Sequence, residues 1–188
     1  MKTLAALAIL ILALPACADS LIGLFADEGG DQCWASIEPY VEIELHVLVF
    51  LDPYDFYGGL TAAEFRLENW PGNPGYPLGM VTANWNSDLL LGELDDDFSI
   101  AFSAAQPGPI VELGTLSLQM FSEDWIEDGQ QIVVGPGNDC SCIVLVDELF
   151  EIYDADGLQF TFNCEELCSC IPGGTPIQSN WSHIKSMY

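Results

Sequence analysis

The chain has 188 residues, of which 29 are Asp or Glu and only 3 are Lys or Arg, so its formal net charge is −26 at pH 7. Such an anionic surface repels nucleic-acid phosphates and anionic membranes, which excludes nucleic acid as a partner and favours cations, basic partners or a saline medium. Half of the residues are hydrophobic, which is enough for a folded core and too many for a disordered chain.

The first eighteen residues have the pattern of an export signal. Lys2 precedes an unbroken apolar run, Leu4–Leu14, which is too short to span a bilayer. The small residues of Ala16-Cys17-Ala18 predict cleavage before Asp19, and lipidation of Cys17 is the alternative. We therefore expect a signal peptide over residues 1–18, a secreted or cell-surface location, and no transmembrane span.

Period-two alternation of apolar residues predicts β-strands, and no long window shows the helical period. In Tyr40–Leu51 the second half is apolar on both faces, which predicts a central strand. In Thr61–Asn69 the alternation points Ala63, Phe65 and Leu67 inward. Further strands are expected at Leu21–Ala26, Gly79–Ala83, Phe98–Phe102, Pro109–Phe121, Gln131–Val134, Ile143–Val146, Leu149–Tyr153 and Leu158–Asn163.

The strand Pro109–Phe121 changes phase at Gly114, which predicts a β-bulge there. About nine short strands separated by turn signals are typical of an all-β fold, a β-sandwich of the jelly-roll or immunoglobulin-like kind. We assign this domain to residues 19–170.

Six cysteines remain beyond the signal, an even number that indicates disulfide bonds in an exported protein. A metal site is the alternative for the two Cys-Ser-Cys pairs, but zinc ligands are usually spaced by two to four residues and no histidine lies nearby. The six are Cys33, Cys140, Cys142, Cys164, Cys168 and Cys170.

A hairpin register suggests how these cysteines pair. If Leu149–Tyr153 and Leu158–Asn163 form a hairpin that turns at Asp154–Gly157, extending its register brings the two Cys-Ser-Cys segments opposite each other. The predicted pairs are Cys142–Cys168, Cys140–Cys170 and Cys33–Cys164, and the closest alternative joins Cys33 to Cys140 or Cys142.

Residue types that bind ligands occur in two groups. Acidic residues cluster where turns are expected, and carboxylate oxygens are the ligands that calcium prefers, although solvated turns explain them equally well. Exposed aromatic rings near strand ends are typical of sugar binding, although many such rings belong to cores. The calcium candidates are Asp95, Asp96, Asp97, Asp154 and Asp156; the carbohydrate candidates are Tyr54, Tyr57, Trp85 and Trp125.

Residues 171–188 have the composition of a linker followed by a short amphipathic tail. Ile171–Ser179 is rich in Pro, Gly, Thr and Ser, and an apolar stripe at helical spacing follows it. Eight residues do not hold a helix alone in water, so the tail either docks on a partner or frays. The predicted docking residues are Trp181, Ile184 and Tyr188.

The run Val47–Trp70, together with Gly114-Thr115-Leu116-Ser117-Leu118, loosely resembles the cohesin and carbohydrate-binding β-sandwich superfamily. The segments Ile22–Gly30 and Trp181–Tyr188 resemble those of secreted bacterial proteins. The first resemblance implies a β-sandwich and carries over no site residue, since no dockerin-contact residue matches. The second implies export and a surface-attachment tail.

Catalytic motifs are missing from the sequence. It holds two histidines, His46 and His183, and neither a Gly-x-Ser-x-Gly motif nor a phosphate-binding loop. Paired carboxylates occur by chance among 29 acidic residues. We therefore expect a non-enzymatic exported protein that has a structural or interaction role and binds an extracellular protein or envelope component. The alternative is a carbohydrate-binding module for a polysaccharide, with calcium as its one candidate cofactor.

Overall fold

The computed structural model describes residues 20–69, 79–121, 129–138, 141–164, 168 and 170. All twelve regular elements in these ranges are strands, and within them no helix is long and apolar enough to cross a membrane. The strands are β1 (Ser20–Phe25), β2 (Trp34–Ala35), β3 (Glu42–Phe50), β4 (Leu60–Glu68), β5 (Gly79–Trp85), β6 (Leu89–Leu91), β7 (Phe98–Gln106), β8 (Ile110–Met120), β9 (Gln131–Gly135), β10 (Ile143–Asp147), β11 (Ile152–Gly157) and β12 (Gln159–Phe162).

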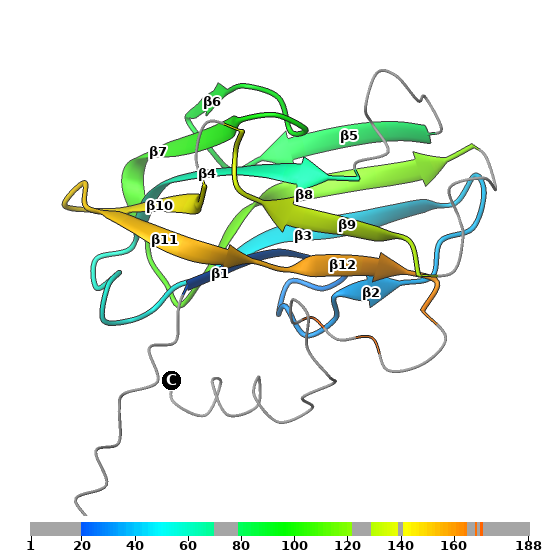
Figure 1. The fold of residues 1–188 in the computed structure, drawn as a ribbon, viewed down its shortest axis with the longest axis horizontal. Helices are drawn as coiled ribbons and strands as arrows, with labels where there is room; N and C mark the ends of the chain where they lie inside the picture. Colours follow the sequence, from blue (N-terminus) through cyan, green and yellow to red (C-terminus); the bar gives the residue numbers. More distant parts are fainter. Residues whose placement is uncertain are drawn as a thin grey trace, which may run out of the picture.

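Hydrogen bonds connect the strands in the order β2-β12-β9-β4-β10-β11-β1-β3-β8-β5, and β7 joins β4 to β6. Figure 1 shows β4 and β9 in front of β8 and β3, so this path folds over into two layers, one with β12, β9 and β4 and the other with β1, β3, β8 and β5. The predicted all-β sandwich is therefore confirmed. The core between the layers is built of apolar side chains, and among its largest buried ones are Leu45, Phe65, Leu113, Phe160 and Phe162.

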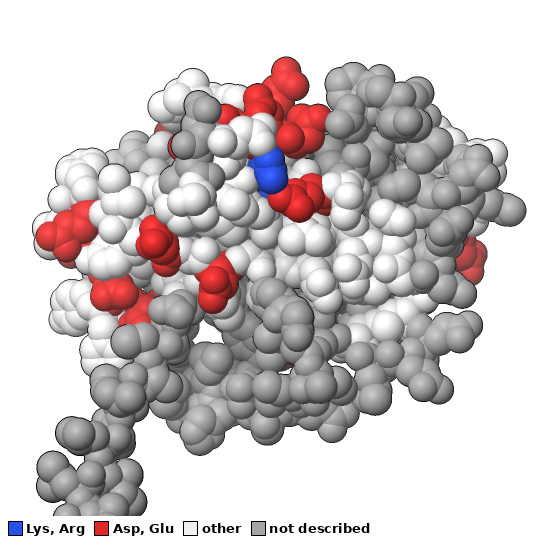
Figure 2. Space-filling view, in the orientation of Figure 1, with Lys and Arg blue, Asp and Glu red and all other residues white. Residues whose placement is uncertain are grey.

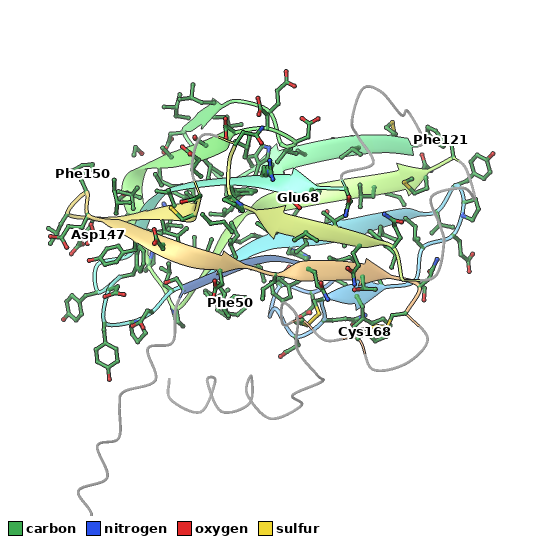
Figure 3. All side chains as sticks on the ribbon, viewed as in Figure 1. Phe50, Glu68, Phe121, Asp147, Phe150 and Cys168 are labelled. Atoms are coloured by element: carbon green, nitrogen blue, oxygen red, sulfur yellow. A yellow bond between two sulfur atoms is a disulfide. The ribbon has the colours of Figure 1, made fainter. Side chains whose placement is uncertain are left out.

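The second half of β3 is buried on both faces, as its apolar pattern predicts. Residues from Leu45 to Val49 are at most 9% exposed. On the outer face, Phe50 (labelled in Figure 3) packs edge-on against Phe25 with ring centroids 5.4 Å apart. The ring of Phe50 also fills the space beside Gly30, whose φ of +69° suits glycine. The loop after β1 thus covers β3.

The predicted β-bulge is also confirmed. In the pairing of β3 with β8, Val47 lies opposite Gly114 and Leu48 opposite Glu112, so Leu113 is the extra residue. A side chain at position 114 would overlap the carbonyl oxygen of Asn84 on β5. Glycine at this position therefore lets three strands stay paired across the bulge.

Strand β4 follows its predicted alternation. Ala63, Phe65 and Leu67 are at most 2% exposed, and the polar side chains between them are half-buried on the opposite face. One of these is Arg66, the one Lys or Arg within the described ranges, whose guanidinium lies among acidic side chains in Figure 2.

The predicted turn at Asp154–Gly157 is wrong, and so is the strand at Leu149–Tyr153. The chain turns at residues 148–151, and β11 then runs extended through Gly157 into β12. Two observations explain the difference. The Asp147 carboxylate accepts the N–H groups of Leu149 and Glu151 at 2.8 Å, which fixes the earlier turn. Pairing of β11 with both β1 and β10 then keeps the later Asp-Gly segment extended.

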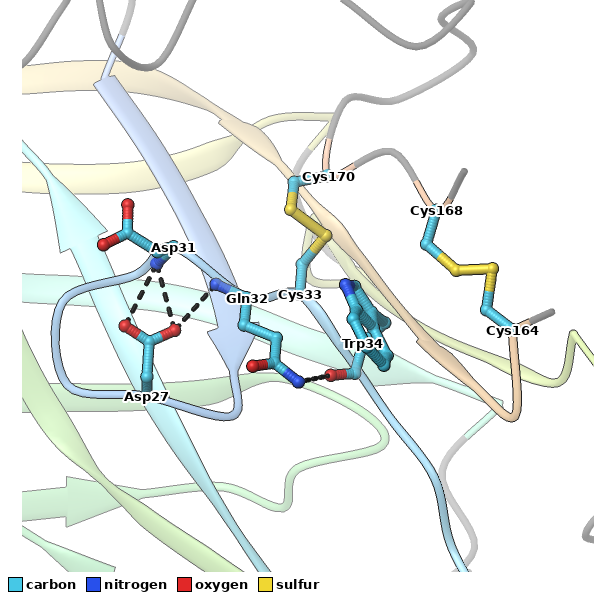
Figure 4. The surroundings of a disulfide bond; sticks show 8 residues. All are labelled: Asp27, Asp31, Gln32, Cys33, Trp34, Cys164, Cys168 and Cys170. Carbon is cyan, nitrogen blue, oxygen red and sulfur yellow. Dashed lines mark hydrogen bonds between the residues drawn. A yellow bond between two sulfur atoms is a disulfide. The ribbon is translucent and has the colours of Figure 1, made fainter. Parts of the chain in front are cut away.

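The two disulfide bonds in the described residues also differ from the predicted pairs. Cys33 bonds to Cys170 and Cys164 bonds to Cys168, with Cα atoms 5.4 Å and 6.2 Å apart (Figure 4). The predicted register fails because it started from the wrong hairpin turn. Instead, β12 pairs in parallel with β2, which directly follows Cys33, and the segment after β12 leads to Cys170 beside that cysteine. Cys142 is half-buried, and Cys140 lies outside the described residues.

We predict that the Cys33–Cys170 bond contributes most of the disulfide stabilisation. It spans 137 residues, whereas Cys164–Cys168 spans 4. On the chain-entropy estimate, the double variant Cys33→Ala/Cys170→Ala loses about 4 to 5 kcal/mol in free energy of unfolding, and Cys164→Ala/Cys168→Ala loses about 2 kcal/mol. Urea denaturation measures both losses. Equal losses, or a non-reduced peptide map linking Cys33 to another cysteine, would contradict this assignment.

Candidate binding surface

One end of the sandwich carries five apolar side chains that are almost completely exposed. The loop of residues 51–59 contributes Tyr54 and Tyr57, which are 92% and 94% exposed. The β10–β11 hairpin contributes Leu149, Phe150 and Ile152, which are 71%, 80% and 70% exposed. We call these five residues the loop-end surface.

The two segments lie side by side. The carboxylate of Glu148 fills the space beside Gly58, and the rings of Phe56 and Tyr153 lie 4.9 Å apart. The Thr61 hydroxyl, at the start of β4, donates to the carbonyl oxygen of Asp147 at 2.7 Å. These contacts place the loop against the hairpin, so the five exposed side chains belong to one end of the molecule.

Buried groups hold the loop with its tyrosines pointing outward. Asp52 is 8% exposed; its N–H donates to Ser20 Oγ at 3.0 Å and its carboxylate accepts the N–H of Tyr54 at 2.7 Å. Phe56, at 4% exposure, anchors the middle of the loop in the core. Since Asp52 and Phe56 are fixed, Tyr54 and Tyr57 are left on the solvent side.

The hairpin is fixed in a comparable way. Asp147 is 5% exposed and caps the turn through its two backbone hydrogen bonds. Phe150 has a φ of +64°, a conformation that costs free energy for a non-glycine residue. Figure 3 shows Phe150 at the tip of this hairpin, beyond the ends of the strands. The turn therefore holds the ring of Phe150 in solvent, where the ring gains no stabilisation from burial.

A shallow cavity of about 280 Å³ opens beside the loop. Its walls are mainly apolar, and the chain on its far side passes through a cis peptide bond between Gly108 and Pro109. The lining residues are Leu51, Pro53, Phe56, Tyr57, Gly58, Pro107, Gly108 and Pro109. The cavity therefore adjoins Tyr57 and extends the loop-end surface with rigid apolar walls.

Acidic side chains lie beside this apolar surface. Figure 2 shows carboxylates gathered at the end of the sandwich where the β10–β11 hairpin lies. The Tyr153 hydroxyl donates to Glu151 at 3.0 Å, and this hydrogen bond raises the pKa of Tyr153 to about 12, assisted by the charges of Glu151, Asp147 and Asp55. The end of the sandwich thus combines exposed apolar area with negative charge.

The predicted aromatic candidates are distributed unevenly. Tyr54 and Tyr57 belong to the loop-end surface, whereas the ring of Trp85 lies 4.7 Å from that of Phe98 and packs at the edge of the core. Trp125 and the tail residues Trp181, Ile184 and Tyr188 lie outside the described residues.

The exposed hairpin residues were missed because their apolar sequence looks like a buried strand. Asp147 and Glu148 precede Leu149-Phe150 and Glu151 follows, but in a chain with 29 acidic residues such flanks do not single out an exposed turn.

The acidic calcium candidates occupy two separate places. Near Asp95–Asp97, the amide of Asn138 accepts from Arg66 Nη1 and donates to Asp96, and Arg66 Nη2 donates to Glu68 at 2.5 Å. Asp154 and Asp156 are exposed on one face of β11. Within the described residues, no group of three or more His, Cys, Asp or Glu side chains is arranged to hold a metal ion.

The histidine of β3 has a structural contact. His46 is 9% exposed and its Nδ1 lies 2.6 Å from the Glu112 carboxylate on β8. The other Glu112 oxygen accepts from Asn86 Nδ2 at 3.2 Å. This group ties β3, β8 and the chain after β5 together on the outer face of the sheet.

Comparison with known proteins gives similar folds and no family. No family model matches the chain, and neither does any curated protein. Among solved structures, a cohesin module from a family 33 glycoside hydrolase of Clostridium perfringens is 12% identical, with a TM-score of 0.47, covering 78% of this chain and 97% of its own. A non-cellulosomal cohesin from the archaeon Archaeoglobus fulgidus is 11% identical, with a TM-score of 0.42, covering 89% and 98%. Both are cohesins, the family that the sequence loosely resembles.

We predict that Asp147 holds the hairpin in place. In Asp147→Ala the N–H groups of Leu149 and Glu151 lose their acceptor, so the free energy of unfolding falls by about 1 to 3 kcal/mol. Limited proteolysis between residues 148 and 151 becomes faster. The matched control is Asp154→Ala, which removes an exposed carboxylate from the same hairpin and leaves both readouts within error. Equal stability of the two variants would show that the cap is dispensable.

Proposed function

We propose that this protein is a non-enzymatic interaction module, exported to the cell surface or medium, that binds an extracellular protein or envelope component through the loop-end surface. The observation that carries the proposal is the gathering of five side chains, each at least 70% exposed and all apolar or aromatic, at one end of the sandwich. Soluble proteins rarely leave such a group exposed unless a partner covers it. Aromatic residues on a rigid support are also the usual anchors of protein interfaces.

The charge of the molecule indicates which class of partner fits the loop-end surface. This protein has a net charge of −26, and carboxylates lie beside the loop-end surface. A partner is therefore more complementary to it if basic residues surround the partner's apolar contact area. Electrostatic attraction then speeds association and weakens with salt. The proposed partner is therefore a basic protein or basic envelope component with an apolar contact area.

Two further observations support this proposal. The disulfides Cys33–Cys170 and Cys164–Cys168 are typical of proteins that work outside the cytoplasm, which fits a signal peptide over residues 1–18. The buried carboxylates of Asp52 and Asp147 accept backbone N–H groups. Since these two carboxylates stabilise turns, a structural role explains why they are buried, and no catalytic role is needed to explain it.

A carbohydrate-binding module is the second candidate, and the exposure of Tyr54 and Tyr57 favours it. Two aromatic rings on one loop, next to a cavity with proline walls, offer flat apolar area for stacking against a sugar of a polysaccharide. Calcium belongs to this alternative only; of its predicted ligands Asp95, Asp96, Asp97, Asp154 and Asp156, the last two lie on β11, which adjoins the hairpin.

The test compares binding by the wild type with binding by three variants. A hairpin variant (Leu149→Ser/Phe150→Ser/Ile152→Ser) and a loop variant (Tyr54→Ala/Tyr57→Ala) each remove one half of the loop-end surface. A control (Tyr40→Ser/Phe121→Ser) removes another exposed aromatic pair, with ring centroids 6.2 Å apart, at the opposite end of the sandwich (Figure 3). Immobilised proteins are exposed to envelope and medium fractions of the source organism, and retained proteins are quantified.

We expect a specific protein to be retained by the wild type and the control and to lose about tenfold or more in affinity with the hairpin variant. Retention that is unchanged in both surface variants would contradict the proposal. Binding to a glycan array that disappears in the loop variant and persists in the hairpin variant would establish the carbohydrate alternative instead.

A further inference from the structure

Strand β5 ends one side of the sheet, and within the part of the chain that the structure describes no strand pairs with its outer backbone edge. It pairs with β8 over seven residues in unbroken register, from Gly79 opposite Met120 to Trp85 opposite Gly114. In the strand order it stands at the end of the path, so β8 is its only strand partner among the described residues. Met80, Thr82, Ala83 and Asn84 are exposed. A row of backbone N–H and C=O groups is thus available along this edge.

The β5 edge has none of the features by which proteins usually protect such an edge. Between Gly79 and Trp85 there is no proline, no lysine and no register shift. The strand is also firmly held, because Trp85 packs against Phe65 and Phe98. A rigid, regular and uncharged edge is the kind that accepts another strand.

Strand β5 is itself uncharged in a strongly anionic molecule. No acidic residue occurs between Glu68 and Asp88, a stretch of nineteen residues that contains β5. Beyond Asp88, β6 adds three more uncharged residues, Leu89 to Leu91, each more than 40% exposed. Acidic residues lie on either side of these strands in the sequence, with Asp88 between β5 and β6 and with Glu93 and Asp95–Asp97 after β6, so the uncharged part is the β5 strand itself (Figure 1).

We infer that a second copy of this chain pairs with β5 along this edge, joining the two copies into one continuous antiparallel sheet about a two-fold axis. The absence of charge within β5 suits this partner: a basic protein gains more from the acidic surfaces elsewhere, whereas two copies with a net charge of −26 each repel one another least where both present an uncharged strand.

The strand is complementary to itself in this arrangement. With the axis at Thr82, the middle residue of β5, Thr82 faces Thr82 of the second copy, Met80 faces Asn84, and Val81 faces Ala83. Threonine pairs are favourable across antiparallel strands, and no like charges are opposed. Since the residual repulsion between the copies is long-ranged, the dimer strengthens as sodium chloride screens it.

The experiment places opposite charges at Thr82, the residue on the two-fold axis, in two separate variants. Thr82→Glu and Thr82→Lys each place two like charges directly opposite one another, so each variant alone dimerises about tenfold or more weakly than the wild type. An equimolar mixture of the two opposes Glu with Lys and restores the dimer. The control Gln159→Glu adds one negative charge on β12, which is an interior strand of the pairing order, and leaves the dimer unchanged. Sedimentation equilibrium measures the wild type, the two Thr82 variants, their mixture and the control.

The inference is overturned if the wild type stays monomeric at about 100 μM in 0.5 M sodium chloride, or if the mixture of the two Thr82 variants remains as weak as each alone. A measurement on the wild type keeps the test independent of folding defects. Amide hydrogen exchange in β5 slows with rising protein concentration if the edge is paired, and constant exchange in a dimeric sample contradicts the proposal.

Discussion

The crossing of one long strand from the first layer to the second is the constraint on which the rest of the structure depends. Strand β11 pairs with β1 and β10, and β12, one residue later, pairs with β9 and β2. At the crossing, the N–H of Leu158 donates to Ile22 at 2.8 Å and its carbonyl accepts from Val134 at 3.0 Å. Leu158 thereby joins both layers through its backbone.

Close approach at this point requires glycine. A side chain at position 157 would overlap the backbone carbonyl oxygen of Val134, and a Cβ at position 23 would lie 2.9 Å from that of Leu158. Neither position has a positive φ, so the requirement is one of space between backbones and not of backbone conformation.

The same crossing connects the loop-end surface with the disulfides. Strand β11 starts from the hairpin that carries Phe150, and β12 leads to Cys164. Ser20, at the start of β1, lies opposite Ala155 of β11 and accepts the N–H of Asp52 in the neighbouring loop. Both halves of the loop-end surface are therefore fixed to the pair of strands that closes the sandwich.

The sequence predicts most of this fold because alternation is a local property. Strand β3 with its buried second half, the inward residues of β4 and the bulge at Gly114 follow from apolar patterns within single strands. The turn at Asp154–Gly157 was predicted wrongly because Asp-Gly is a local turn signal that pairing with β1, more than 130 residues earlier, overrides. The disulfide pairs inherited that error, since cysteine pairing depends on which strands are neighbours.

Of the loop-end surface, only the tyrosines were predictable. Tyr54 and Tyr57 lie between turn residues, whereas Leu149 and Phe150 have the apolar character of a strand. Their exposure depends on the side chain of Asp147, which ends β10 by accepting two backbone hydrogen bonds. Such a cap is visible in a structure and is hard to distinguish in sequence from any other acidic residue of this chain.

The free energy of unfolding of Gly157→Ala tests most directly whether the crossing governs the fold. We expect a loss of about 3 kcal/mol, because the added methyl group meets backbone atoms that move only if the strands separate. Asp156→Ala, which changes an exposed side chain next to it, is expected to stay within about 0.5 kcal/mol of the wild type. Equal stability of both variants and the wild type in urea denaturation would contradict this account.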